Sequence, residues 1–99
     1  MPEMTMTVRW PDGREQECYS PSLVLHDYLA PGSYPVAEFE RRSLQALEVA
    51  SARVKEKFGF ACTSAAATAA QIRHAAARYA PADAVTVVRL WPPLPGAAR

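Results

Sequence analysis

The fold is decided first by residues 4–19, MTMTVRWPDGREQECY, in which two extended segments flank a turn. Apolar and polar side chains alternate from Met4 to Trp10, which is the period-two pattern of a β-strand with one face on a core. Proline presets φ and glycine accepts the left-handed conformation, so Pro11-Asp12-Gly13 predicts a tight turn. Residues 14–19 then return as a second strand. Because this strand is mostly polar, we expect it at an edge of the sheet.

Two helix-start signals follow, each a serine with a proline close behind it. Ser20-Pro21 predicts a short helix to about Leu29, and Ser33-Tyr34-Pro35 predicts the start of a much longer one. The long helix carries an apolar stripe at three- and four-residue steps as far as Phe58 and is expected to end at Gly59. A third, alanine-rich helix over residues 63–79 is predicted to pack antiparallel to it.

The last predicted strand, residues 84–90, is apolar on both faces. Val85 and Val87 would point one way and Val88 and Leu90 the other, which is typical of a central strand or of one that a second subunit covers. The order of elements predicts an α+β fold with a three-stranded sheet, made of the N-terminal hairpin and the C-terminal strand. A short helix and a long antiparallel helix pair would cover one face. Residues 1–91 form a single domain in this interpretation, and the proline-rich residues 92–99 a disordered tail.

Composition and charge argue against several classes of function. Eleven Lys and Arg residues against ten Asp and Glu give a net charge of +1, so neither nucleic acid nor an anionic membrane is expected as a partner. No apolar stretch approaches the ~20 residues of a membrane span, and the first residues lack the pattern of a signal peptide. The expected location is therefore the cytoplasm, where two cysteines would be free thiols. No cofactor is expected, because the four glycines are scattered and form no phosphate-binding loop.

Six short motifs stand out along the chain. They are Arg9-Trp10-Pro11-Asp12-Gly13, Cys18-Tyr19-Ser20-Pro21-Ser22, Asp27-Tyr28-Leu29, Ser33-Tyr34-Pro35, residues 46–54 (ALEVASARV) and Gly59-Phe60-Ala61-Cys62. Their joint spacing, over about residues 1–90, resembles that of a family of small bacterial nitrogen-starvation-response proteins. The resemblance implies a setting and not a reaction: gene clusters for nitrogen scavenging that also encode a nitrilase, a radical-enzyme homologue and an acetyltransferase homologue. The alanine-rich third helix and the proline-rich tail depart from the family's pattern.

Cys18, His26 and Asp27 are the residues that a thiol catalyst would use as nucleophile, base and orienter. Adjacent side chains on a helix point about 100° apart, however, so Asp27 cannot easily orient the imidazole of His26. Cys62 precedes the third helix, whose dipole would lower the pKa of an exposed thiol, although its apolar neighbours favour a packed turn. A buried structural cysteine and a surface histidine explain the same residues.

A metal site would have to draw on Cys18, His26, Cys62 and His74, which show no CxxC or HxxxH spacing, so none is predicted. Trp10 has two interpretations. At the end of the first strand it either closes the rim of the core or offers a flat apolar platform to a partner.

Three interpretations of the function remain open. The first is a non-catalytic accessory or interaction protein of the bacterial nitrogen-starvation response. It would be a homodimer acting on a partner from a nitrilase-type nitrogen-scavenging pathway, with Trp10, Val88 and Leu90 as the possible partner surface. The alternative is a small cysteine-dependent enzyme or redox-sensitive regulator that uses Cys18 or Cys62. A third interpretation is a peptide-binding module that adds a strand along the edge of the second strand.

Overall fold

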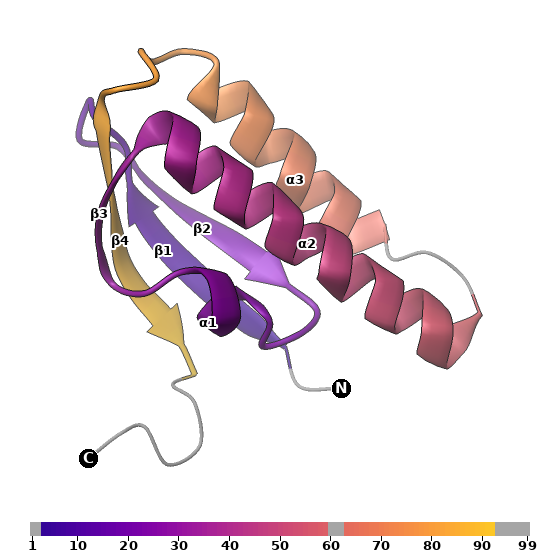
Figure 1. Ribbon diagram of the computed structural model, residues 1–99. Coiled ribbons are helices and arrows are strands. Elements are labelled where there is room, and N and C mark those ends of the chain that lie inside the picture. The colour runs from indigo at the N-terminus through magenta and orange to yellow at the C-terminus, as the bar shows by residue number, and fades with distance from the viewer. Residues whose placement is uncertain (1–2, 60–62, 93–99) are drawn as a thin grey trace.

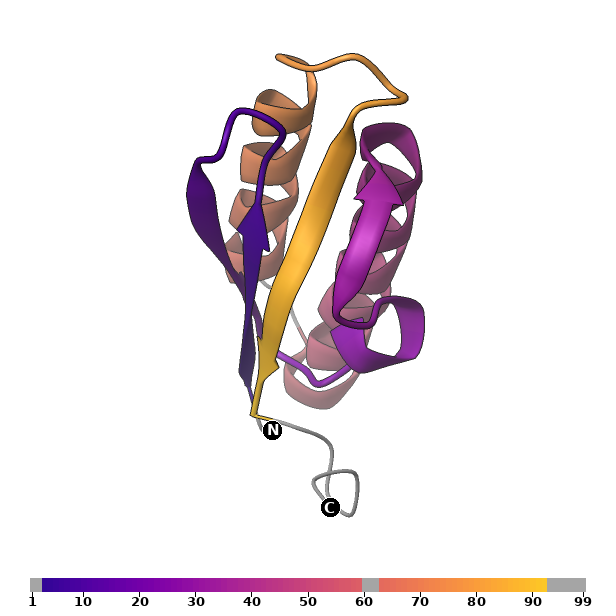
Figure 2. The ribbon, with the colours of Figure 1, turned by 90° about the vertical axis from the view of Figure 1, so that its left-hand side faces the viewer.

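A four-stranded antiparallel sheet backed by helices forms the protein. The structure is a computed structural model that describes residues 3–59 and 63–92. The elements are β1 (Met4–Arg9), β2 (Glu15–Ser20), α1 (Leu25–Tyr28), β3 (Gly32–Pro35), α2 (Val36–Phe58), α3 (Thr63–Ala76) and β4 (Ala84–Trp91). The strand order is β2-β1-β4-β3, and α2 and α3 lie side by side on one face (Figure 1). Figure 2 shows the opposite face, with α2 and α3 behind the strands; we call it the open face.

The β1–β2 hairpin forms as predicted. Every second side chain of β1 is buried, beginning with Met4. In the turn Gly13 takes the left-handed conformation, with φ at 92°, and the backbone N–H of Trp10 donates to the Arg14 carbonyl oxygen at 2.8 Å. The Asp12 carboxylate accepts from the Arg14 backbone N–H at 2.9 Å, which fixes the turn further. β2 lies at one edge of the sheet, as its polar sequence indicated.

The sheet has four strands and not the three predicted, because Gly32–Pro35 forms strand β3 at the second edge. This segment pairs antiparallel with the first half of β4, and the Ser33 and Thr86 hydroxyls lie 3.3 Å apart across the pair. Ser33 therefore does not cap α2. Pro35 occupies the N-cap position instead, with no side-chain cap hydrogen bond. A proline is tolerated here because an edge strand can do without its backbone N–H.

Helix α1 is shorter than predicted. The sequence pattern placed its start at Ser20, but that residue ends β2. The Ser20 hydroxyl donates to the Ser22 carbonyl oxygen at 2.7 Å and accepts from the Ser22 N–H at 3.3 Å. This local turn competes with a helical start, as serine side chains often do. The helix ends at Tyr28, and the C-cap residue Leu29 has an extended backbone with φ −138° and ψ 152°.

The long helix α2 is present, and its C-terminal end agrees with the prediction. It ends at Gly59, which has φ at 84° and donates its N–H to the Lys55 carbonyl oxygen at 2.7 Å. Helix α3 runs antiparallel to α2, as predicted (Figure 1), but it ends at Ala76 and not near Tyr79. The N–H groups of Arg78 and Tyr79 donate three residues back, at 3.1 Å each, so the last turn tightens and the helix stops.

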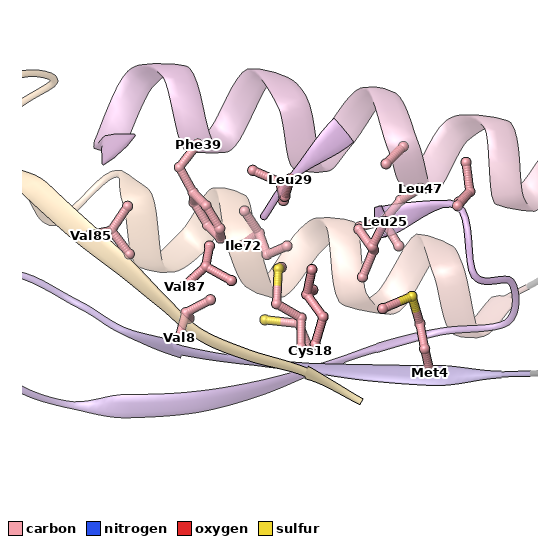
Figure 3. Packing of buried hydrophobic residues seen from close by; sticks show 14 of the residues in the cluster. Met4, Val8, Cys18, Leu25, Leu29, Phe39, Leu47, Ile72, Val85 and Val87 are labelled. Carbon is pink, nitrogen blue, oxygen red and sulfur yellow. The ribbon is translucent and has the colours of Figure 1, made fainter. Parts of the chain in front are cut away.

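The core lies between the sheet and the two long helices (Figure 3). Its largest fully buried side chains include Met4, Met6, Val8, Leu25, Phe39, Leu47, Ile72, Val85 and Val87. Trp10 closes one end of this core with 3% of its surface exposed. Its indole stacks on the Tyr79 ring with centroids 5.6 Å apart, and its Nε1 donates to the Gln16 side chain at 3.0 Å. Of the two interpretations of Trp10, the core position is therefore the correct one.

A β-bulge at Val88 changes which side chains of β4 face the core. The β1–β4 register pairs Thr7 with Arg89 and Val8 with Val87, so Val88 is the extra residue. Leu90, 7% exposed, consequently faces the core like Val87, whereas Val88 is 41% exposed. The prediction that Val88 and Leu90 share a face is wrong, because strict alternation fails across an inserted residue.

Candidate functional site

Cys18 lies on the inner face of β2, opposite Met6 of β1, and is fully buried. It is a free thiol that points from the sheet into the core (Figure 3). Burial removes the water that a thiolate needs and raises the pKa of Cys18 to about 12. At neutral pH the side chain is therefore a thiol, which is a poor nucleophile. The structure makes this candidate nucleophile a core residue.

His26 is half-buried on α1, and its Nε2 lies 2.8 Å from the carbonyl oxygen of Pro92. A carbonyl oxygen only accepts, so Nε2 must carry the hydrogen. The contact ties α1 to the residue that follows β4. Among the hydrogen bonds of residues 3–59 and 63–92, none joins His26 to Cys18 or to the exposed Asp27. The predicted nucleophile, base and orienter are thus not brought together in the described chain.

The remaining chemical candidates give no assembled centre in the part of the chain that the structure covers. Cys62 lies outside the described residues, so a thiol function for it stays a prediction. In residues 3–59 and 63–92, no three His, Cys, Asp or Glu side chains are grouped as a metal ion would require. Over the same ranges, none of the helices has the length and apolar character that crossing a membrane takes.

An open hollow of about 240 Å³ lies between α2 and α3. It is lined by Leu44, Leu47, Glu48 and Ser51 of α2 and by Ala65, Ala66, Ala69 and Arg73 of α3. The short alanine side chains leave this space, because they do not fill the groove beside the leucines of α2. The hollow was not predicted from the sequence, although the alanine-rich composition of α3 is the signal that could have indicated it.

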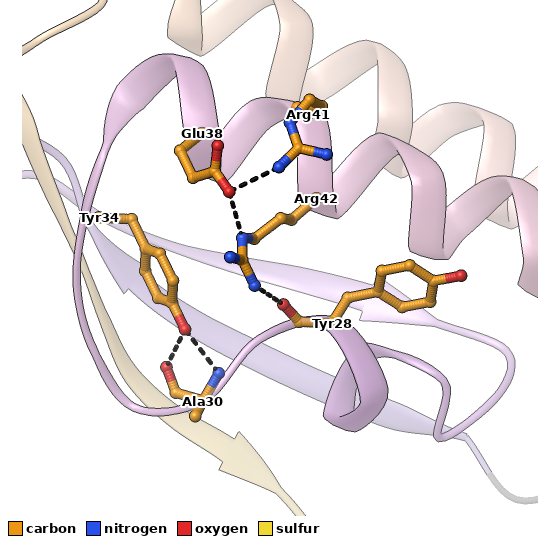
Figure 4. A network of polar contacts seen from close by, with 6 residues as sticks. All are labelled: Tyr28, Ala30, Tyr34, Glu38, Arg41 and Arg42. Carbon is orange, nitrogen blue, oxygen red and sulfur yellow. Dashed lines mark hydrogen bonds and ion pairs between the residues drawn. The ribbon is translucent and has the colours of Figure 1, made fainter.

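A polar network fixes the approach of α2 to the segment after α1 (Figure 4). The Glu38 carboxylate accepts from Arg42 Nε and from Arg41 Nη2, each at 2.6 Å. Hydrogen bonds from Arg42 and then Arg41 lower the pKa of Glu38. Arg42 also donates to the Tyr28 carbonyl oxygen at 3.1 Å and places its guanidinium 5.6 Å from the centre of the Tyr34 ring. These groups satisfy one another, and the network positions β3 at its edge.

The open face carries the exposed aromatic group of the sheet. Its outward positions are Thr5, Thr7 and Arg9 of β1, Glu15, Glu17 and Tyr19 of β2, Ser33 of β3, and Thr86, Val88, Arg89 and Trp91 of β4. Trp91 is 59% exposed, and the Arg89 guanidinium lies 6.0 Å from its ring centre. Tryptophan and arginine are enriched among residues that dominate binding energy at protein interfaces.

The three residues predicted for a partner surface do not lie on one face of the structure. Val88 lies on the open face, whereas Trp10 and Leu90 lie in the core. Trp91 and Arg89 were missed, because their direction depends on the bulge at Val88. No local signal in the sequence distinguishes a bulged strand from a regular one here.

Residues 5–90 match the model of a protein family described as nitrogen starvation-induced protein NitG. The chain belongs to this family. The NitG match begins in β1 and ends at Leu90 of β4, so it includes the three helices of the described chain and all of the sheet except its end residues Met4 and Trp91. This confirms the family suggested by the sequence motifs, and it links the chain to nitrogen starvation. No curated protein and no solved structure matches the chain.

Proposed function

We propose that this chain is a non-catalytic accessory protein of the nitrogen-starvation response that acts by binding protein through its open face. One observation carries the proposal: Trp91 presents 59% of its surface to water on a sheet face that α2 and α3 leave uncovered. Val88 adds exposed aliphatic surface to the same face, and Arg89 adds a cation over the ring. Burying such groups against a partner is favourable by roughly 25 cal/mol per Å² of apolar surface.

The state of Cys18 supports binding over thiol chemistry at this residue. With its pKa raised to about 12, the thiolate is a minute fraction of the population at neutral pH. The alternative function then rests on Cys62. Alkylation of the native protein, read by mass for each cysteine, tests it directly. Rapid modification of Cys62 at neutral pH would favour the thiol alternative, whereas protection until unfolding would favour the binding function.

The physiological part of the proposal comes from the family. NitG is described as nitrogen starvation-induced. The resemblance extends this to a bacterial cytoplasm and to a partner from a nitrilase-type nitrogen-scavenging pathway, which would bind this chain or its assembly.

Photo-crosslinking tests the contact surface. A benzophenone amino acid replaces Glu15, at the margin of the open face, and in a matched control it replaces Gln71, exposed on α3. In nitrogen-starved cells we expect a protein adduct from position 15 that Trp91→Ala reduces severalfold, since removal of an interface tryptophan typically costs more than tenfold in affinity. Equal adducts from both positions, or none from position 15, would contradict the proposal.

A further inference from the structure

The open face is ordered into three rows that run across the strands. The first row is Tyr19, Thr5 and Trp91, the second is Glu17, Thr7 and Arg89, and the third is Glu15, Arg9, Thr86 and Ser33. We call them the aromatic row, the charged row and the ion-pair row. In each of them a residue of β1 stands between a residue of β2 and one of β4. The central strand thus separates two columns of different chemistry.

The charged row has an acid and a base that are too far apart to pair. Glu17 and Arg89 flank Thr7, two strand spacings apart, which is about 10 Å. Neither residue belongs to an ion pair within residues 3–59 and 63–92. In the ion-pair row, by contrast, Arg9 and Glu15 lie on adjacent strands and bond at 2.9 Å. The charged row therefore presents one negative and one positive group outward on either side of a small threonine.

We propose that the occupant of the open face is a second copy of this chain, packed face to face about a two-fold axis parallel to the strands. The inference rests on the proposed function, because it names the partner of the same surface. Such an axis over β1 exchanges the β2 and β4 columns. Glu17 of each copy then lies over Arg89 of the other, and the row makes two ion pairs where the monomer has none.

The charge pattern selects this axis over the other face-to-face arrangement. A two-fold axis that runs across the strands through the charged row would place Glu17 over its own symmetry mate and Arg89 over its own mate. Like charges brought together at an interface are unfavourable, so that arrangement is disfavoured. Packed sheets commonly cross at about 30°. At one strand spacing from the axis this rotation moves a side chain by only ~2.5 Å, which glutamate and arginine can span.

The aromatic row fits the same axis. Trp91 of one copy lies over the β2 column at Tyr19 of the other, so the exposed indole gains an aromatic neighbour. In the ion-pair row Arg9 lies on the axis and faces its own mate, but each Arg9 is paired with Glu15 at 2.9 Å, so two neutral pairs meet there. Thr5 and Thr7 lie along the centre, where their small side chains let the two faces approach. Over the three rows the acidic and basic side chains balance, so the face has no net charge that would attract nucleic acid. A surface that complements its own two-fold mate favours a second copy over an unrelated chain.

The expected dimer is weak. The three rows offer fewer residues than the about 20–30 per side of a standard interface, so we expect a dissociation constant in the micromolar range. Sedimentation velocity over a concentration series, from about 1 to about 500 μM, brackets that range. The fraction of dimer should rise with concentration in the wild type.

Charge reversal tests the geometry. Glu17→Arg alone and Arg89→Glu alone each create two like-charge pairs, and each should weaken the dimer at least about tenfold. An equimolar mixture of the two variants should form a heterodimer near wild-type affinity, because the arginine introduced at position 17 meets the glutamate introduced at position 89. The double variant should also dimerise. Glu56→Arg, the same change at an exposed position of α2, should leave dimerisation unchanged, and circular dichroism checks that each variant is folded.

Two results would overturn the inference. One is a wild type that stays monomeric over the whole series; the other is a mixture that associates no better than its components. The crosslinking experiment separates this failure from that of the proposed function. An adduct of twice the chain mass from position 15 supports the dimer. An adduct of another mass contradicts the dimer but supports the proposed binding function. No adduct at all counts against both.

Discussion

On strand β1 the inner face of the sheet presents Met6 and Val8, both fully buried, while the open face presents Thr7 and Arg9. The inner face requires only apolar side chains of suitable volume. Each strand that packs against the helices provides them at alternate positions. The open face is organised by residues that are neighbours across strands, such as Arg9 and Glu15. The difference teaches that the core follows from alternation within each strand, whereas the open surface depends on the register between strands.

The test of this comparison with the largest expected effect uses two adjacent residues of β1. Met6→Ala should lower the free energy of unfolding by about 2–5 kcal/mol, because it leaves a cavity in the core. Thr7→Ala, on the open face, should lower it by no more than about 1 kcal/mol, the full range of strand propensity. Urea denaturation with both variants in the same buffer measures the two values. Comparable losses would mean that the open face is as tightly packed as the inner one.

A second test probes the inner face through Cys18. Its thiol has an ordinary pKa of 9.0 in the unfolded chain and about 12 in the folded protein. Between these values the unfolded chain loses a proton that the folded chain keeps, so stability is full below pH 9 and falls as pH rises toward 12. Between pH 8 and pH 10.5 the wild type should lose about 2 kcal/mol more than Cys18→Ala, because the loss approaches its full slope of about 1.36 kcal/mol per pH unit only above pH 9.

The reference variant makes the second test specific. Lysines and tyrosines also titrate in this pH range, but they are common to the wild type and Cys18→Ala, so only the difference between the two proteins counts. Denaturant titrations at pH 8, 9, 10 and 10.5 provide it. Parallel pH curves for both proteins would show that Cys18 ionises as easily in the fold as outside it.

A third test, with a smaller expected effect, concerns β3, the edge strand next to β4. The Tyr34 hydroxyl accepts from the Ala30 N–H at 3.0 Å and lies 3.3 Å from the Ala30 carbonyl oxygen (Figure 4). Tyr34→Phe removes these bonds and keeps the ring beneath Arg42, so it should cost about 0.5–1.5 kcal/mol. Hydrogen exchange should show faster exchange confined to β3. Uniform destabilisation of the whole sheet would instead mean that β3 is not a separate margin.

The smallest effect, and the most direct comparison of the faces, is optical. Trp91→Phe leaves the buried Trp10 as the sole indole, and Trp10→Phe leaves the exposed Trp91. In dilute protein, acrylamide should quench Trp91 severalfold more than Trp10, since the two side chains are 59% and 3% exposed. Near-wild-type circular dichroism is the control for Trp10→Phe. Equal quenching of the two indoles at low concentration would contradict the assignment of faces.

Much of the fold was predictable because its signals are local. Alternation in β1, the turn at Gly13 and the helix end at Gly59 each need only a few residues of context. Strand β3 was not predictable by the same means. Ser33-Tyr34-Pro35 satisfies the rules for a helix start, and it becomes a strand only because β4, some fifty residues away in the chain, supplies the pairing.

The surface was less predictable than the core for a related reason. Burial of Cys18 follows once Met6 is opposite it in an antiparallel pair, and that pairing is set by the hairpin turn. The outward position of Trp91 depends on β1 and β4 together, because the bulge is a property of their register. Sequence reasoning found the strand and the exposed Val88, but could not place Leu90 and Trp91 on their correct sides.

The bulge at Val88 reverses which residue numbers of β4, odd or even, point into the core. Before it, odd-numbered residues of β4 point inward, as Val85 and Val87 do; after it, the even-numbered Leu90 points inward and the odd-numbered Trp91 points out. Strict alternation of the same eight residues would instead have turned the indole inward and Leu90 outward. The extra residue is therefore what separates the inward Val87 from the inward Leu90: a variant that lacks Val88 would keep both in the core and Trp91 on the open face, in a strand without the bulge.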